Sequence, residues 1–120
     1  MDNKLKWQEI LARCECGEGW YSLVSEAMNK IELIYQEHNI SMSDDFEILQ
    51  IKQKFGELII YSKSRLRDQV NIAIEEARIK SIQVCEACGA TGRIYKQGNW
   101  RITTLCEKCS EIEGYDPSDE

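Results

Sequence analysis

Six cysteines are the residues of this chain best suited to chemistry, and four of them form two C-x-x-C pairs. Cys85 and Cys88 make the first pair, and Cys106 and Cys109 make the second. Two pairs at this separation match the spacing of a four-cysteine zinc site, in which four thiolates surround the ion as a tetrahedron. Because protein fills all four positions, water and substrate have no place on the metal. We therefore predict that these cysteines bind a structural Zn²⁺ ion, rather than form two disulfides or act as unrelated thiols.

The segment between the two pairs predicts the antiparallel hairpin of a zinc ribbon. Residues 93–97 and 100–105 have the composition of strands. Gly98 and Asn99 between them suit a two-residue turn that begins with glycine. A ribbon of this size is too small to hold a hydrophobic core of its own, so it should pack against the rest of the chain.

The same hairpin presents the surface that we single out for partner binding. A two-residue turn places Gln97 opposite Trp100 and Lys96 opposite Arg101, with Arg93 on the other face. Cations interleaved with aromatic rings suit nucleic acid, because phosphates attract the cations and bases stack on the rings. The alternative is that the aromatic residues are buried against the helices and leave the cations solvated.

The other two cysteines, Cys14 and Cys16, admit three interpretations. They could form a redox-active dithiol, or they could join His38 in a second zinc site. Such a site would have only three good ligands, and residues two apart do not face each other on a helix. We favour buried thiols that pack as small hydrophobes beside a glycine-rich turn. His38, the only histidine, is then a cation placed favourably at a helix C-terminus.

The composition is that of a globular chain of 120 residues with a formal net charge of −6. No apolar run approaches the roughly 20 residues that a membrane span requires. Cysteines without a signal peptide are typical of a reducing compartment, so we expect a cytoplasmic protein. Residues 1–50 carry ten acids and four bases, residues 51–109 six acids and eleven bases, and residues 110–120 five acids and no base. This segregation is compatible with a charged partner or with simple self-neutralisation.

Helical periodicity predicts a short helix over residues 3–13. It should end before Gly17 and Gly19, because two glycines within three positions weaken a helix and favour a turn. Trp20 then closes a structural corner, with its ring in the core. The alternative, a loop that binds a small molecule, lacks the longer glycine pattern of phosphate-binding loops.

A second and longer helix follows this corner. Ser22 can cap its N-terminus, and apolar residues recur at helical spacing until the helix ends near His38. Residues 40–45 are expected to form a loop. Ser64 can cap a third helix, which leads directly to Cys85.

Between these two helices, the pattern predicts a β-hairpin with Phe55 and Gly56 as its turn. This register pairs Lys54 with Glu57 across the strands, and a slip by one residue would lose that pair. It also gives the hairpin one apolar face, formed by Leu49, Ile51, Leu58 and Ile60. The predicted fold is therefore α+β: helices packed with a β-hairpin over residues 1–84, a zinc ribbon over residues 85–109 and an acidic, disordered tail over residues 110–120.

Several segments also carry a resemblance to a known group of proteins. They are Cys16-Gly17-Glu18-Gly19-Trp20, Lys54-Phe55-Gly56-Glu57-Leu58, Cys85-Glu86-Ala87-Cys88-Gly89 with Gly92, and Trp100 leading to Thr104-Leu105-Cys106. In this order they resemble small phage- and prophage-borne proteins with a C-terminal zinc ribbon. The resemblance spans about residues 16–109. It implies an architecture and a phage setting, and with it the cytoplasm of the host, but no particular activity.

The sequence contains no HExxH motif, no phosphate-binding loop and no nucleophile paired with an oriented base, so we expect no enzymatic activity. The leading hypothesis is a cytoplasmic zinc-ribbon protein that acts by binding another protein, such as a host factor that it modulates or inhibits. An acidic chain is a poor general nucleic-acid binder, because long-range repulsion opposes its approach to phosphate. Two alternatives are a nucleic-acid-binding regulator that uses the basic ribbon hairpin and a redox-active thiol protein.

Overall fold

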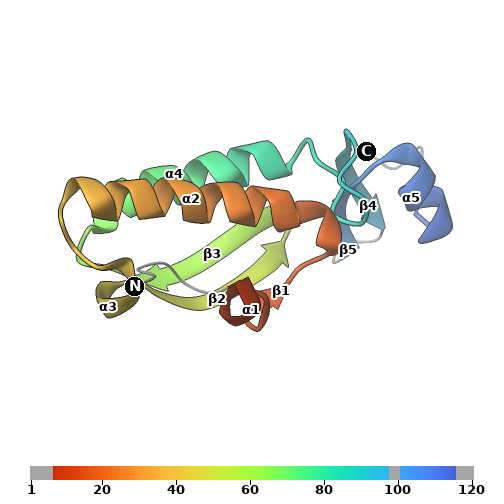
Figure 1. Cartoon of the computed structure of the whole chain (residues 1–120). Helices are drawn as coiled ribbons and strands as arrows, with labels where there is room; N and C mark the ends of the chain where they lie inside the picture. Colours follow the sequence, from red (N-terminus) through yellow and green to blue (C-terminus); the bar gives the residue numbers. More distant parts are fainter. Residues whose placement is uncertain (1–6, 98–100, 116–120) are drawn as a thin grey trace.

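Two long helices lie across one face of a small sheet, and a second hairpin stands at one end of the molecule (Figure 1). The computed structural model describes residues 7–97 and 101–115, with Trp7 described by its backbone alone, and has the predicted α+β class. None of the described helices is long and apolar enough to cross a membrane. The elements in chain order are α1 (Trp7–Leu11), β1 (Cys14–Glu15), the 3₁₀ helix η1 (Glu18–Trp20), α2 (Tyr21–Glu37), α3 (Met42–Asp45), β2 (Glu47–Lys54), β3 (Glu57–Lys63), α4 (Arg67–Ser81), β4 (Arg93–Gln97), β5 (Arg101–Leu105) and α5 (Glu107–Ile112).

The larger sheet has the strand order β1-β2-β3, in which β1 runs parallel to β2 and β3 runs antiparallel to it. The predicted hairpin turn is confirmed, because Phe55 and Gly56 connect β2 to β3 and Lys54 pairs with Glu57. Both turn residues have positive φ angles, 53° and 83°, as a two-residue turn of the type I′ kind requires.

A β-bulge in β2 changes one residue of the predicted apolar face. The register shifts between Ile48 and Gln50, so Ile48 is buried while Leu49 is 44% exposed. An extra residue in one strand reverses which side chains face the core beyond it. The prediction was therefore wrong for Leu49, whereas Ile51, Leu58 and Ile60 are buried as expected.

Helices α2 and α4 pack side by side over this sheet (Figure 1). Exposed ion pairs join them, one between Lys30 and Glu76 at 3.1 Å and one between Lys80 and Glu26. Each helix buries residues that recur every three or four positions, which closes one face of the sheet. The buried residues are Leu23, Val24, Ala27, Met28, Ile31 and Tyr35 of α2, and Val70, Ala73, Ala77 and Ser81 of α4.

The helix starts differ from the sequence prediction. Helix α2 begins at Tyr21, directly after η1, and Ser22 does not cap it. Helix α4 begins at Arg67 with no side-chain cap. The Ser64 hydroxyl instead accepts a hydrogen bond from the Leu66 backbone N–H at 2.9 Å, one turn before the helix starts. The helices therefore begin within a few residues of the predicted starts, but neither Ser22 nor Ser64 caps its helix.

The predicted loop over residues 40–45 contains a short helix, α3, so that expectation was wrong in part. Asp45, the last residue of α3, accepts hydrogen bonds from two other segments of the chain. Its carboxylate accepts hydrogen bonds from the Tyr35 hydroxyl at 2.5 Å and from the Arg65 backbone N–H at 3.1 Å. The Tyr35 hydroxyl also meets the Ser64 hydroxyl. One carboxylate thus ties the end of α2 to the start of α4.

These contacts predict a pH dependence of stability. The hydrogen bond from Tyr35, opposed in part by burial and assisted by Arg65, lowers the pKa of Asp45 below its usual range. A lowered pKa in the folded state contributes stability above the unfolded-state pKa of about 3.9, and that stability is lost as the pH falls through the folded value. Urea unfolding of Asp45→Asn and wild type should differ most at neutral pH and converge in acid. A difference that stays constant with pH would contradict this prediction.

Candidate metal centre

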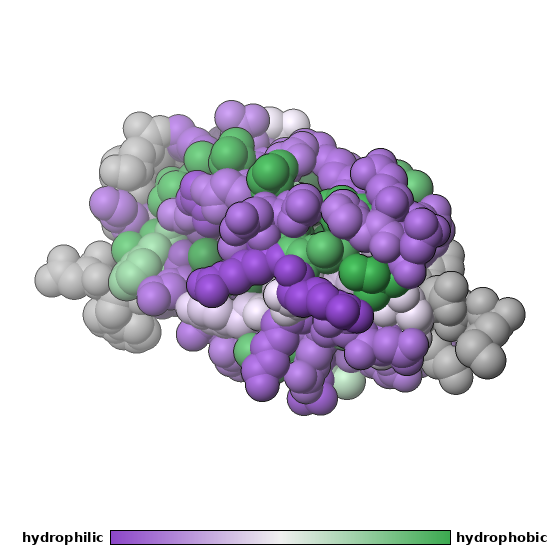
Figure 2. All heavy atoms as spheres, turned by 90° about the vertical axis from the view of Figure 1, so that its left-hand side faces the viewer, coloured by the Kyte–Doolittle hydropathy of each residue, from purple (hydrophilic) through white to green (hydrophobic). Residues whose placement is uncertain are grey.

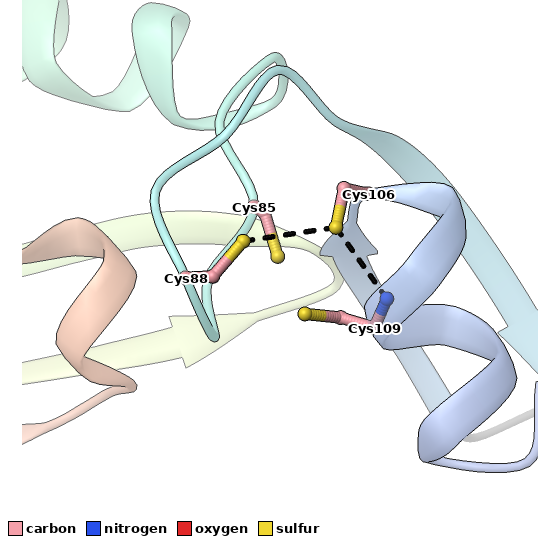
Figure 3. A group of neighbouring side chains, drawn as sticks. All are labelled: Cys85, Cys88, Cys106 and Cys109. Atoms are coloured by element: carbon pink, nitrogen blue, oxygen red, sulfur yellow. Dashed lines mark hydrogen bonds between the residues drawn. The ribbon is translucent and has the colours of Figure 1, made fainter.

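The structure brings the four predicted cysteines together at the ribbon end of the molecule, with their sulfur atoms around one common space (Figure 3). All four sulfurs lie within 4.8 Å of one another, and Cys88 Sγ lies 3.7 Å from Cys106 Sγ. A tetrahedral ion with metal–sulfur bonds of about 2.3 Å requires sulfur–sulfur separations of about 3.8 Å. None of the cysteines is in a disulfide. The four cysteines can therefore hold a metal ion.

The first pair lies on a tight turn after α4. Cys85 donates its backbone N–H to the Ala90 carbonyl at 2.7 Å, and Gly89 donates to the Cys85 carbonyl at 2.9 Å. Gly89 has a φ of 86°, in the left-handed region that glycine adopts without strain. This closed turn holds the Cys85 and Cys88 sulfurs on one side of the space. Cys85 is buried and Cys88 is the exposed member of the group.

The second pair is positioned by the start of α5. Cys106 is the N-cap residue of this helix, and its sulfur accepts a hydrogen bond from the Cys109 backbone N–H at 3.4 Å. Backbone N–H groups at a helix start favour a negatively charged acceptor, which suits a thiolate. Strand β5 delivers Cys106 to this place, opposite the turn that carries Cys85 and Cys88.

The surroundings act differently on individual thiols. Burial disfavours the Cys85 thiolate, but backbone N–H groups directed at its sulfur, those of Cys106 and Cys88 first, outweigh burial and lower its pKa to about 7. The pKa of Cys109 is raised, chiefly by its hydrogen bond with the Cys106 sulfur and secondly by burial. Four thiolates at these distances repel one another, and a bound cation offsets that repulsion.

Glu86, between the two cysteines of the first pair, joins the centre to the N-terminal corner. Its carboxylate accepts hydrogen bonds from the Gly17 backbone N–H at 2.8 Å and the Thr103 hydroxyl at 2.7 Å. Its backbone carbonyl accepts a hydrogen bond from Gly19 at 2.7 Å. The turn at residues 85–88 is therefore fixed to both the corner and β5 through Glu86.

Close approach of two backbone segments explains the glycines of the corner. A Cβ atom at Gly19 would lie 2.1 Å from the Cys85 carbonyl oxygen, and one at Gly17 would lie 2.4 Å from the Glu86 carbonyl oxygen. Backbone atoms cannot yield to such contacts, so any larger residue would push the corner away from the turn at residues 85–88. The predicted structural corner is present, but its contact with this turn was not foreseen, because no local pattern links positions so far apart.

Trp20 completes the corner. Its ring is fully buried, as predicted, and its Nε1–H donates a hydrogen bond to the Val84 carbonyl at 2.7 Å. Val84 directly precedes the first metal-ligand candidate, Cys85. The core residue of the corner therefore also holds the chain that enters the candidate metal centre.

A further contact joins the ribbon to the first hairpin and gives a testable prediction. The buried Thr104 hydroxyl donates to the Gly56 carbonyl at 2.7 Å. Thr104→Val keeps the volume but leaves that carbonyl without its partner, so we expect a loss of about 1–3 kcal/mol in urea unfolding. Thr91→Val, at an exposed ribbon position, is the control and should change stability by less than about 0.5 kcal/mol. Equal effects of the two substitutions would show that the buried hydrogen bond contributes nothing.

The ribbon hairpin forms with a different register from the predicted one. Gln97 pairs with Arg101, and Lys96 pairs with Ile102. Three residues, 98–100, connect the paired ends instead of two, and the predicted turn residues and Trp100 lie outside the described residues. The prediction that Lys96 faces Arg101 directly was therefore wrong, and no like-charge pair crosses the hairpin at that place.

The predicted partner-binding cations have different surroundings. The Arg93 guanidinium lies 4.9 Å from the Tyr95 ring centroid, and its Nε–H donates to the Tyr95 hydroxyl at 3.1 Å. The Arg101 guanidinium lies 4.6 Å from the Tyr115 ring centroid and donates to the Gln97 side chain. Lys96 is exposed. Two of the three described cations thus stack on tyrosine rings, Arg93 on Tyr95 of β4 and Arg101 on Tyr115 after α5.

Residues 110–115, which were predicted to belong to a disordered tail, are folded against the ribbon. Helix α5 continues to Ile112, Ser110 is fully buried, and Tyr115 is only 6% exposed. Tyr115 packs edge-on against Tyr95 with 6.4 Å between ring centroids. The tail prediction was therefore wrong for residues 110–115, and residues 116–120 lie outside the described part. An isolated tyrosine within an acidic segment was the signal in the sequence for this contact.

Cys14, Cys16 and His38 lie outside the four-cysteine group. Cys14 is in β1 and donates its thiol to the Ile10 carbonyl at 3.5 Å. Both thiols are half-buried and pack against the larger hydrophobic core. His38 is the C-cap of α2, with Nδ1 within 2.9 Å of the Ile34 carbonyl oxygen. The structure therefore does not bring these three residues to the candidate metal centre.

No family model, no curated protein and no solved structure matches the chain. The resemblance to phage-borne zinc-ribbon proteins therefore stays a prediction from the quoted segments.

Proposed function

We propose that the chain is a non-enzymatic zinc-ribbon protein that works by binding another protein. The observation that carries this proposal is the four-cysteine group, whose sulfurs lie within 4.8 Å of one another and which the corner and β5 fix through Glu86. Four protein ligands saturate a tetrahedral ion. The ion then holds a small folded platform together and takes no part in a reaction.

Zinc is the metal that this ligand set favours. Thiolates are soft ligands, and four of them in a tetrahedral arrangement select Zn²⁺ or an iron–sulfur centre. The site spacing of two C-x-x-C pairs on a ribbon is typical of the structural zinc class. Elemental analysis of purified protein should give one zinc per chain, and bound iron with visible absorbance would contradict this assignment.

The redox alternative has little support from Cys14 and Cys16. Desolvation by burial raises the pKa of both thiols, to about 12 for Cys16, with Cys14 and Glu86 adding to the effect at Cys16. A thiol is reactive as its thiolate, so a raised pKa makes a poor nucleophile at neutral pH. These two cysteines serve better as half-buried packing residues, Cys14 in β1 and Cys16 directly after it.

The nucleic-acid alternative depends on cations that have other contacts. Arg93 and Arg101 stack on Tyr95 and Tyr115, and Arg101 also donates to the Glu113 backbone carbonyl at 3.4 Å. Phosphate would have to compete with these contacts at the ribbon. The net charge of −6 adds long-range repulsion. A protein partner, such as a host factor of a phage, is therefore the better proposal.

An affinity experiment with the zinc-loaded full chain tests this function. Bacterial lysate is passed over the immobilised chain with and without nuclease treatment, and bound proteins are quantified against a Cys85→Ser control. We expect one lysate protein to bind in an amount stoichiometric with the immobilised chain. This protein should remain bound after nuclease treatment and be absent from the Cys85→Ser control. Capture that disappears with nuclease, together with a salt-sensitive gel shift of DNA, would favour the nucleic-acid function instead.

A further inference from the structure

Strand β3 forms an edge of the larger sheet, because the strand order is β1-β2-β3. Lys54 and Glu57 close the two-residue turn and therefore exchange backbone hydrogen bonds, and every second pair after them does the same. Residues 57, 59 and 61 are thus bonded to β2. Leu58, Ile60 and Ser62 direct their backbone N–H and C=O groups away from the sheet.

One end of this edge is closed by α4. The Leu58 N–H donates to the buried Ser81 hydroxyl at 2.9 Å, and the Glu57 side chain is bonded to Arg78. The other end differs. Among the described residues, no hydrogen bond to the outward backbone groups of Ile60 and Ser62 is found. An edge with free donors and acceptors is a template for another extended strand.

A hollow of about 410 Å³ opens beside this free part of the edge. One of its walls is the end of β3, and the other is the first turns of α4. The face of the molecule at which α4 begins carries mostly hydrophilic side chains with hydrophobic ones between them (Figure 2). The residues that line the hollow are Ile60, Tyr61, Ser62, Lys63, Ser64, Arg67 and Asn71.

The hollow is positively charged. Of the described residues that line it, Lys63 and Arg67 carry positive charge and none carries negative charge. Both cations are exposed, and neither forms an ion pair with another residue of the described ranges 7–97 and 101–115. The neighbouring Arg65, in contrast, pairs with Asp45 at 3.2 Å. With no ion pair to another described residue, Lys63 and Arg67 favour an occupant with negative charge.

We propose that this groove between β3 and α4 binds an extended, acidic peptide segment of the protein partner, which adds to β3 as a further strand. The free backbone groups of Ile60 and Ser62 supply hydrogen bonds to the peptide backbone. Lys63 and Arg67 select acidic side chains on alternate peptide positions, and the hollow accepts the side chains that point toward α4. The inference rests on the proposed binding function and names its surface and the chemistry of its partner.

A second copy of the chain fits this groove less well. Antiparallel pairing of two β3 edges through Ile60 and Ser62 would place Lys63 of one copy opposite Ile59 of the other copy, so Lys63 would gain no acidic partner across the strand pair. An acidic peptide offers carboxylates to both Lys63 and Arg67.

The test uses ¹⁵N-labelled, zinc-loaded full chain and a decapeptide of alternating glutamate and valine as probe. We expect the largest amide shifts at Ile60 and Ser62. Arg67→Glu, at an exposed position, should weaken binding at least about tenfold. Lys96→Glu reverses the same kind of charge on the ribbon hairpin and should leave the affinity within about twofold. A peptide that alternates lysine and valine should not bind.

Three results of the peptide titration would contradict the proposed peptide-binding groove. They are the absence of shifts at peptide concentrations up to about 1 mM, shifts confined to the ribbon, and equal binding by wild type and Arg67→Glu. Sedimentation could also show a dimer of the wild-type chain that Arg67→Glu dissociates. That result would assign the groove to a second copy and contradict the proposed peptide ligand. A partner captured equally by wild type and Arg67→Glu would refute the groove while leaving the proposed function intact. Peptide binding in the groove, with no protein captured from lysate, would support the groove and contradict the proposed function.

Discussion

Loss of the proposed zinc ion is expected to unfold the ribbon. With zinc in the four-cysteine centre, Cys85→Ser or chelation of the ion removes the link between the turn at residues 85–88 and the start of α5. Among the described residues, the hydrophobic cluster at the ribbon has four buried members, Cys85, Tyr95, Leu105 and Tyr115. A cluster of this size does not offset the entropy of ordering some thirty residues, each of which costs about 1–2 kcal/mol. On the proposed zinc-ribbon function, metal binding supplies the folding free energy of this part of the chain, of the order of 10 kcal/mol.

The measurement follows the two parts of the chain separately. Amide signals of β4, β5 and α5 should collapse after chelation, while signals of α2 and α4 persist at a lowered melting temperature, since the larger core keeps its own residues. Cys14→Ser is the matched control, because this cysteine lies outside the metal-ligand group. It should retain one zinc per chain. A ribbon that keeps its amide signals after the zinc is shown to be gone would contradict a structural role for the metal.

The features that sequence predicted best are those that short-range geometry determines. Two C-x-x-C pairs encode tetrahedral ligand spacing directly, and the structure places their four sulfurs around one space. The turn at Phe55 and Gly56 was predictable because one register satisfies both the charge pair and the apolar face. In both cases, residues close together in the sequence determine the feature.

The features that sequence missed depend on distant contacts or on one extra residue. Glu86 bonds to Gly17, and Thr104 bonds to Gly56, across separations of 69 and 48 positions that no local pattern reveals. The bulge at Leu49 and the three-residue connection after Gln97 each shift a register by one. Side chains along a strand alternate between the two faces of the sheet, so a shift by one residue moves a side chain to the other face.

Trp20→Ala is expected to be the most damaging substitution away from the metal ligands. The ring is fully buried in the larger core, and truncation of a buried tryptophan typically costs about 3–5 kcal/mol. The Val84 carbonyl also loses its donor, which adds about 1–3 kcal/mol if that carbonyl stays buried and unpaired. Because Val84 directly precedes Cys85 and the turn at residues 85–88, we expect the zinc affinity to fall together with the stability.

Urea unfolding and a competitive zinc titration of the same variants measure both effects. Trp20→Phe keeps most of the ring volume but has no N–H donor, so it should lose less stability than Trp20→Ala while still weakening zinc binding. Leu33→Ala truncates a side chain of α2 that is 57% exposed, and it should change stability by less than about 0.5 kcal/mol. If Trp20→Ala costs less than about 1 kcal/mol, the corner is not part of the core. If zinc affinity is unchanged in both Trp20 variants, the hydrogen bond to Val84 does not couple the corner to the metal.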